Sequence, residues 1–268
     1  MSAALLVCLG LCAGAGAGFL AGLIGIGGGI VVVPVVYYGL VAAGASVNEA
    51  AHVAVSTSLA AILPTAIVSS IAHWRAGNAD LTFLREWGPG IALGVIIAQL
   101  TAPHLGGSFL TGIFALFCLA VACRFAMPGW FQPLRAEPPR GGFCHLAGAG
   151  IGLVSGFAGV GGGILTNVVM TLVGMSMHKS IGRAAAVGLV VSVPATLVAV
   201  LGSMSLEGGN LGSINLPMWA CIAPAQAAAA WIGAHVAQKI TGEHLSRVFA
   251  VVLAGTGLVM MHSSFGWP

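Results

Sequence analysis

Long apolar stretches separated by short polar breaks dominate the chain. No Asp, Glu, Lys or Arg occurs before Glu49, and none occurs between Arg140 and Lys179. Each of these two stretches exceeds the roughly 20 apolar residues that a helix needs to cross the hydrocarbon of a bilayer. The pattern therefore predicts an all-helical, polytopic membrane protein.

Apolar length and turn-forming residues divide the chain into ten predicted helical segments. The first five cover about 3–24, 28–43, 48–72, 87–103 and 108–125, and the second five about 144–158, 162–175, 181–201, 216–237 and 244–262. The Pro-rich, charged stretch between the two sets cannot span a membrane. We therefore expect a first transmembrane repeat at 1–126, a cytoplasmic linker at 127–143 and a second transmembrane repeat at 144–268.

The two sets of segments are related by an internal repeat. The phrase Gly18–Ile30 returns as Gly152–Ile164 with six glycines and the closing isoleucine in register, and Pro64 pairs with Pro194 further along. Glycine interruptions at corresponding positions of two apolar halves are the best sequence sign of a transporter binding site. We name residues 25–28 the first glycine break and residues 159–162 the second.

The cationic residues decide how the chain passes each glycine break. If the chain turns back there, each half has five segments, the second half is inverted, and all nine Lys and Arg residues fall on one side. A straight span would split them five against four. Because cytoplasmic loops carry the Lys and Arg excess, we predict two inverted repeats with both termini outside the cytoplasm.

Composition limits the classes of partner and chemistry. Hydrophobic residues make up 58% of the chain and charged residues 6%, against about 25% charged residues in soluble domains. No basic tract with interleaved aromatic residues exists, so we expect no nucleic-acid partner. The start of the chain lacks the basic region of a cleaved signal peptide. The six cysteines have no zinc-site spacing, and we interpret them as small buried apolar residues.

Acidic residues are confined to connections and helix ends. Cation pumps and proton relays usually place Asp or Glu inside the membrane, so this distribution favours an anion as the transported ion. It also argues against a hydrolase of the carboxylate or zinc type, and no Ser–His pair with a third orienting group is discernible. We expect no enzymatic activity, no cofactor and no metal site.

The glycine breaks are the leading candidates for the substrate site. A new helix is expected to begin after each break, at about Gly29 and Gly163, with unpartnered N–H groups and the positive end of its dipole. Two such ends meeting near mid-depth would bind an anion without a buried cation. The candidate residues are Gly27, Gly28, Gly29, Gly161, Gly162 and Gly163. The stripes Gly14–Gly18–Gly22 and Gly148–Gly152–Gly156 are instead typical of close helix packing.

Several polar side chains are further candidates. Ser56, Thr57 and Ser58 precede Pro64 by about two turns, where hydroxyls contact an anion or replace hydrogen bonds that the proline removes. Asn167 lies one turn into its helix, where its amide donates to an oxyanion or to a neighbouring helix. The facing of Gln99 and Gln226 is left open.

Two histidines and one arginine each have a possible role in transport and a simpler structural explanation. His52 and His235 lie in or near predicted spans and invite a proton-relay role, although a local hydrogen bond is the more common role of such a histidine. Arg183 is expected at the cytoplasmic mouth, where either anion attraction or membrane orientation accounts for it.

These residues together give the chain a resemblance to a known family. The duplicated Gly22–Gly29 and Gly156–Gly163 segments, Pro34 after the first of them, and the Pro-containing segments around Pro64 and Pro194 resemble the sulfite exporter TauE/SafE family over essentially the whole chain. The resemblance implies a bacterial inner-membrane permease for sulfite, organosulfonates or related small anions, commonly an exporter. Val168 stands where the first copy has Pro34, so the two breaks need not bind equivalently.

We therefore predict a secondary transporter of small anions that holds its substrate at the converging helix N-termini. The expected partners are the anionic substrate and the lipid bilayer, and a homodimer is left open. An anion channel and a non-transporting membrane scaffold are the competing hypotheses.

Overall fold

The computed structural model is a bundle of helices. It describes residues 3–24, 27–77, 80–127, 141–175, 177–202, 210–237 and 242–264. Gly25 and Ile26 of the first glycine break and residues 128–140 of the predicted linker lie outside the described residues. The predictions for those positions therefore remain predictions.

The helices of the first half are α1 (Ala3–Ile24), α2 (Gly29–Ala42), α3 (Val47–Arg75), α4 (Leu81–Thr101) and α5 (Gly107–Ala126), with the short 3-10 helix η1 (Ala102–His104) between α4 and α5. Those of the second half are α6 (Gly142–Ala158), α7 (Gly163–Leu172), α8 (Met177–Leu201), α9 (Leu216–Ala237) and α10 (Gly242–Ser264). A small antiparallel hairpin of β1 (Asn210–Leu211) and β2 (Ile214–Asn215) precedes α9. The predicted all-helical class and its ten segments are confirmed.

Four helices are long and apolar enough to cross a membrane, by length and composition, among the described residues. They lie at Val47–Arg75, Leu81–His104, Gly107–Ala126 and Lys179–Leu201. The helices that follow the glycine breaks are shorter, with 14 residues in α2 and 10 in α7. At 1.5 Å per residue they are roughly 21 and 15 Å long, less than the roughly 30 Å of hydrocarbon. Neither can cross alone.

The first helix of each half packs along a helix of the other half. Glycines in one helix face backbone carbonyl groups of the other. A Cβ atom on Gly18 of α1 would lie 2.0 Å from the backbone carbonyl oxygen of Gln226 in α9. Likewise, a Cβ atom on Gly152 of α6 would lie 2.0 Å from the Ile91 oxygen of α4. The two predicted glycine stripes therefore serve close backbone packing, as expected.

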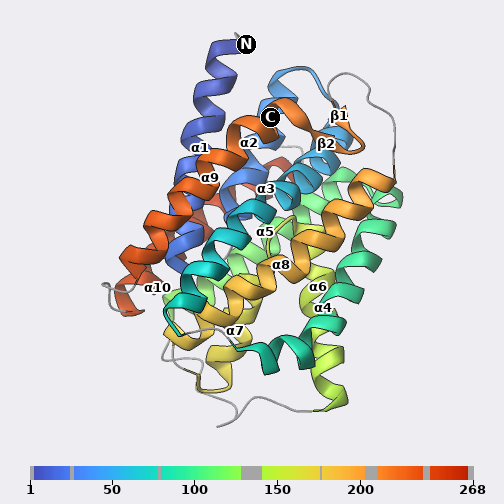
Figure 1. The fold of residues 1–268 in the computed structure, drawn as a ribbon. Coiled ribbons are helices and arrows are strands. Elements are labelled where there is room, and N and C mark those ends of the chain that lie inside the picture. Colours follow the sequence, from blue (N-terminus) through green and yellow to red (C-terminus); the bar gives the residue numbers. More distant parts are fainter. Residues whose placement is uncertain are drawn as a thin grey trace.

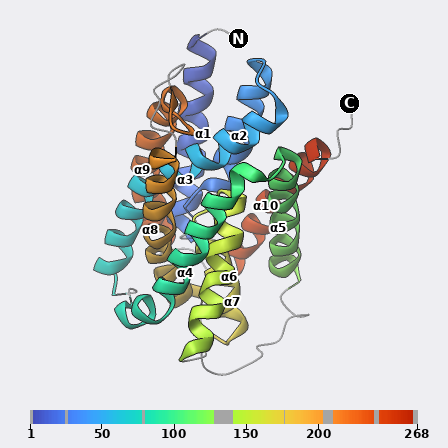
Figure 2. The ribbon, with the colours of Figure 1, turned by 90° about the vertical axis from the view of Figure 1, so that its right-hand side faces the viewer.

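The remaining helices also associate across the halves. Helix α5 lies beside α10, and α3 beside α8 near the centre of the bundle. Figures 1 and 2 show both ends of the chain at the same end of the molecule. Helix α1 runs away from that end, whereas α6 starts at the opposite end and runs back toward it (Figure 2).

The core is built mainly from small and β-branched residues. Phe114 and Phe249, from α5 and α10, are fully buried, and Trp87 of α4 fills a second cluster. The prediction that the cysteines are buried is wrong for three of them. Cys118 and Cys144 are buried, whereas Cys8, Cys12 and Cys123 are exposed. Their helices present these positions to the outer surface, where a lipid-facing thiol costs little.

Candidate functional site

Both glycine breaks place the chain in a backbone conformation that favours glycine. Gly27 and Gly28 have φ of 76°, and Gly159 and Gly162 have φ of 69° and 71°. A side chain is disfavoured there because its Cβ collides with the backbone. The left-handed residues Gly28 and Gly162 directly precede α2 and α7, and neither helix has a side-chain cap. The helices thus begin where the repeat predicts, with their first N–H groups uncapped by side chains.

The two breaks meet in the middle of the bundle. A Cβ atom on Gly27 would lie 3.3 Å from the Gly161 Cα, and one on Gly29 would lie 2.5 Å from the Gly159 oxygen. All six candidate glycines are buried. The breaks also contact the central turns of α3 and α8, through Ile62 and Val187. Residues that lie 134 positions apart in the sequence are therefore brought into one place.

A glutamine from the opposite half donates a hydrogen bond to the first break and to the turn that precedes the second. The Gln226 side-chain nitrogen, from α9, donates to the Gly27 carbonyl at 2.7 Å. The Gln99 side-chain nitrogen, from α4, donates to the Gly156 carbonyl at 3.0 Å, one turn before the second break. Both amides are buried. The sequence left open where these two side chains point, and in the structure both point toward the glycine breaks.

The three candidate hydroxyls of α3, those of Ser56, Thr57 and Ser58, contact the second half of the chain. The Ser58 hydroxyl donates to the Gly159 carbonyl at 2.8 Å. The Ser56 hydroxyl accepts from Ser213 at 2.9 Å, and the Thr57 hydroxyl accepts from the Asn215 N–H at 2.9 Å. Ser56 and Thr57 therefore bind the β1–β2 hairpin to α3 through hydrogen bonds, while Ser58 forms a hydrogen bond with the second break. Contact of these hydroxyls with a substrate remains a prediction.

Asn167 faces the beginning of α8 and is fully buried. Its side-chain oxygen accepts a hydrogen bond from the Ser180 hydroxyl at 2.7 Å. This is the interhelical alternative that the sequence left open, although Asn167 takes part in a further interaction as well. Its donation to an anion remains a prediction.

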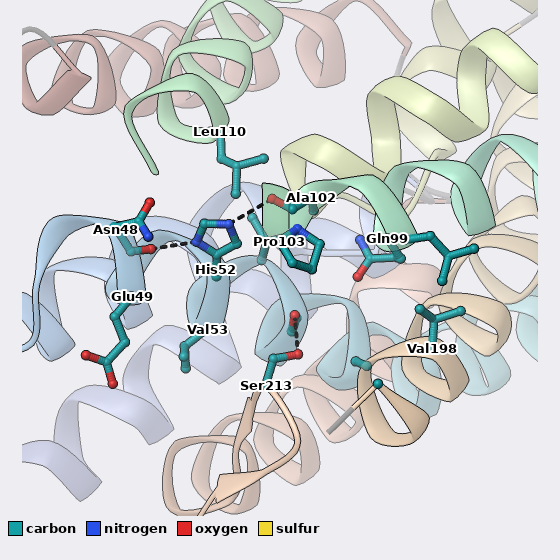
Figure 3. Close-up of a pocket in the computed structure, with 15 residues that line it drawn as sticks. Asn48, Glu49, His52, Val53, Gln99, Ala102, Pro103, Leu110, Val198 and Ser213 are labelled. Atoms are coloured by element: carbon teal, nitrogen blue, oxygen red, sulfur yellow. Dashed lines mark hydrogen bonds between the residues drawn. The ribbon is translucent and has the colours of Figure 1, made fainter. Parts of the chain in front are cut away.

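A cavity of about 580 Å³ opens between the two halves near the hairpin (Figure 3). Its polar lining residues are Asn48, Glu49, His52, Ser56, Gln99 and Ser213, and apolar residues of α3, α4, η1, α5 and α8, with Gly202 after α8, complete it. The volume suits a small molecule. The six candidate glycines are not among the lining residues.

The cavity nevertheless adjoins the second break. Val55 lines it, and a Cβ atom on Gly159 would lie 3.0 Å from the Val55 Cα. Gln99 also lines it and holds Gly156. One layer of side chains therefore separates the cavity from the meeting point of the breaks.

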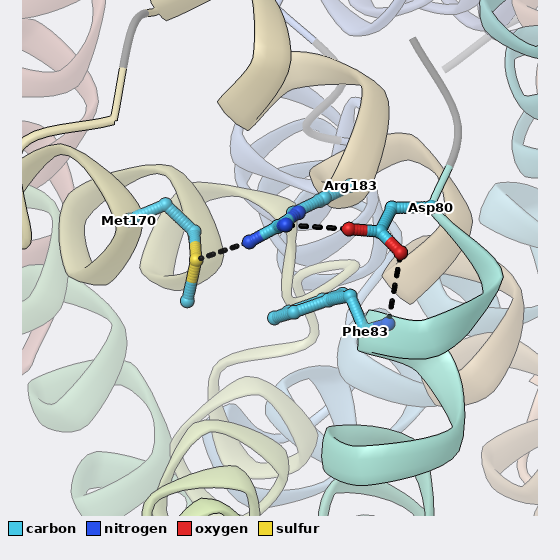
Figure 4. Close-up of polar contacts among 4 residues, drawn as sticks. All are labelled: Asp80, Phe83, Met170 and Arg183. Carbon is cyan, nitrogen blue, oxygen red and sulfur yellow. Dashed lines mark hydrogen bonds and ion pairs between the residues drawn. The ribbon is translucent and has the colours of Figure 1, made fainter. Parts of the chain in front are cut away.

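An ion pair joins the two halves at the opposite end of α3. The Arg183 Nη2 and Asp80 Oδ2 atoms are 2.5 Å apart, and the guanidinium lies 4.9 Å from the centre of the Phe83 ring (Figure 4). Asp80 also caps α4 by accepting from the Phe83 N–H. Burial alone raises the pKa of the Asp80 carboxyl, but the Phe83 N–H and the Arg183 guanidinium outweigh it and lower that pKa.

Three features of the site were missed from the sequence. The cavity residues Asn48 and Glu49 were assigned only to a helix start, the hairpin was not predicted, and Asp80 was not paired with Arg183. Each depends on contacts between segments far apart in the chain, for which a single sequence carries no periodic signal. The amides of Gln99 and Gln226 were the available signal, since uncharged polar groups inside a span require partners.

The chain is similar to proteins that are named as membrane transporters. The profile of the family described as sulfite exporter TauE/SafE matches residues 10–260. A probable membrane transporter protein of Haemophilus influenzae is 30% identical over 250 residues, which is 92% of this chain and 95% of the relative. A probable membrane transporter protein of Methanocaldococcus jannaschii is 26% identical over 261 residues, with 91% of each chain covered. No solved structure matches the chain.

Proposed function

The chain belongs to the sulfite exporter TauE/SafE family, and from this premise we propose that it is a secondary transporter that exports small anions such as sulfite or organosulfonates. The family and the relatives make it a multi-pass membrane transporter. The anionic substrate, the exporting direction and the bacterial inner membrane are our proposal.

The meeting of the two glycine breaks is the observation that carries this proposal. It brings the N-termini of α2 and α7 together without a side-chain cap on either. Unpartnered N–H groups at a helix start attract anions, and two starts add their fields. The described residues near the breaks are uncharged, so a cation would find no compensating carboxylate. The arrangement therefore favours a small anion over a cation.

In this conformation the breaks are covered by protein. Gln226 and Ala17 lie against Gly28, and Val187 and Val191 lie against Gly162. An anion in the cavity would reach the α7 amides if the layer formed by Val55 and Gln99 moved aside. Because both breaks rely on glycine and α3 and α8 contain Pro64 and Pro194, these are the points at which the backbone can deform.

The relation between the halves supports an inverted repeat. Helix α1 packs on α9 as α6 packs on α4, and α1 and α6 run in opposite directions (Figure 2). We propose that one group of helices rocks against the other, so that the site opens to one side of the membrane and then to the other. With the Lys and Arg residues on the cytoplasmic side, both termini lie outside the cytoplasm and the cavity opens there.

Flux into proteoliposomes tests the proposal. Labelled sulfite, methanesulfonate, chloride and a monovalent cation are each supplied to the full-length protein. Saturable flux of sulfite or methanesulfonate, accelerated by the same anion on the other side, is the expected result. Flux of the cation alone would contradict the anion assignment.

The same assay separates the competing functions. An anion channel would give flux that does not saturate and shows no acceleration by anion on the other side. A scaffold would give none, and Gly28→Ala would then change assembly alone.

A further inference from the structure

His52 contacts two carbonyl groups on the wall of the cavity (Figure 3). Its Nδ1 lies 2.7 Å from the backbone carbonyl oxygen of Asn48, in the preceding turn of α3. Its Nε2 lies 2.9 Å from the Ala102 oxygen at the start of η1. Both distances fall within hydrogen-bond range, so the ring bridges α3 and the end of α4.

The two acceptors determine how many protons the ring needs. A carbonyl oxygen only accepts hydrogen bonds, and a neutral imidazole has one N–H. A neutral ring would turn a lone pair toward one of the carbonyls. Both contacts are hydrogen bonds only when each nitrogen holds a proton, which makes the imidazole a cation.

Glu49 sets the charge that this proton balances. It lies one turn before His52 on α3, and among the residues lining the cavity these two are the titratable ones. His104 at the end of η1 is exposed and outside the lining, and the lining residues from α5, α8 and the hairpin are uncharged. The lining therefore carries one negative charge when His52 is neutral and none when it is protonated.

We propose that His52 binds a proton that accompanies the anion, so that the cavity passes a small anion on to the glycine breaks only with His52 protonated. Loss of the proton restores the negative charge of the lining and removes the donor to one carbonyl. The anion then leaves and the contact between α3 and η1 weakens. This inference rests on the proposed function and adds the proton as the coupled ion.

Equilibrium binding of methanesulfonate to the purified full-length protein tests the inference. This anion keeps its charge across the pH range in which histidine titrates, between about pH 5 and 8. Because apparent affinity scales with the fraction of binding-competent protein, we expect wild-type affinity to fall about tenfold or more from pH 5 to pH 8. His52→Gln should bind weakly at every pH, and His52→Lys tightly at every pH.

Two further variants complete the experiment. Glu49→Gln should bind more tightly at pH 8 and retain the pH dependence, because it removes the negative charge but not the titrating group. His235→Gln is the matched control, since His235 makes the same contact with a carbonyl four residues earlier, at 2.8 Å, and does not line the cavity. It should keep the wild-type pH profile.

The outcomes separate the two levels of inference. Wild-type pH dependence in His52→Gln, or wild-type affinity that does not change with pH, would overturn the role of His52 and leave the anion transporter standing. Failure of the wild-type protein to bind methanesulfonate or sulfite at any pH would overturn both. Nitrogen-15 NMR of labelled histidine gives an independent reading, since His52 should have two protonated ring nitrogens at pH 5.

Discussion

At the residue scale, glycine at the breaks combines two properties that no other residue offers. Gly162 has a positive φ, and a Cβ atom there would lie 2.8 Å from Val191 Cγ2 and 3.0 Å from Val187 Cγ1. Backbone strain and crowding therefore coincide at the residue that precedes α7. Gly27 and Gly28 of the first break share this requirement, since each has a positive φ and a Cβ atom on either would lie within 3.0 Å of a neighbouring atom.

Gly162→Ala should reduce anion flux strongly while the protein still assembles. The left-handed conformation costs an alanine about 1–2 kcal/mol, and relief of that strain displaces the α7 amides. Gly150→Ala is the control, since a Cβ atom on Gly150 of α6 meets nothing within 4 Å. Flux per reconstituted protein and the unfolding temperature are the measurements. Full flux in Gly162→Ala would show that the second break takes no part in transport.

Several residue roles were predictable and others were not. The repeat located the breaks and the starts of α2 and α7, because three consecutive glycines weaken a helix and favour its interruption at that point. The protein partners of Ser56, Thr57 and Asn167 depend on where the hairpin and α8 lie, and no local pattern encodes that. His52 was identified as titratable, but its second carbonyl lies 50 positions away.

At the element scale, the helix pairs α1–α9 and α4–α6 depend on backbone contact. The glycines of α1 and α6 remove the side chains that would hold the helices apart. Apolar side chains cannot supply this attraction in a membrane, since lipid is equally apolar, so close van der Waals packing and polar contacts must do so. The ten segments were predictable from the sequence because their apolar length and punctuation are local properties.

Gly18→Ala should destabilise the protein by about 1–3 kcal/mol, the usual cost of overpacking, or more. Its Cβ atom would lie 2.0 Å from the Gln226 carbonyl oxygen, so α1 and α9 would have to separate. Gly16→Ala, on the same helix with nothing within 4 Å, should be neutral or slightly stabilising because alanine favours helix. Thermal unfolding in detergent distinguishes them. Equal effects of the two substitutions would contradict the packing role.

At the scale of the whole molecule, the cavity and the ion pair lie at opposite ends of α3. The cavity opens between the halves on the side of the hairpin, and Asp80 with Arg183 joins the halves on the other side. This is the asymmetry expected of a transporter that exposes its site to one side at a time. We expect the ion pair to separate when access is exchanged.

Asp80→Asn should weaken the contact between the halves that closes the side of the protein opposite the cavity. It should keep the cap of α4, because asparagine can still accept a hydrogen bond from the Phe83 N–H. A partly exposed pair such as this one contributes about 1 kcal/mol, so binding of methanesulfonate from the cavity side should weaken by up to about fivefold. Arg85→Gln, an exposed charge on the same helix, is the control. Unchanged binding in Asp80→Asn would exclude the ion pair as a closure.

The pH dependence of this closure follows from the lowered pKa of Asp80. A group whose folded pKa is depressed stabilises the structure above its ordinary range, and that stabilisation is lost as the pH falls through the lowered value. The pair should therefore stay intact from pH 5 to 8 and weaken only below about pH 4. Any change in binding between pH 5 and 8 must therefore arise from a group other than Asp80.

The central claim is that a small anion binds where the two glycine breaks meet, and a crystal structure with bound selenite tests it most directly. Selenite has the charge and shape of sulfite, and selenium is located by its anomalous scattering. The account predicts a selenium position within hydrogen-bond distance of the first N–H groups of α2 or α7. A selenium position elsewhere in the protein, with both breaks still covered, would contradict it.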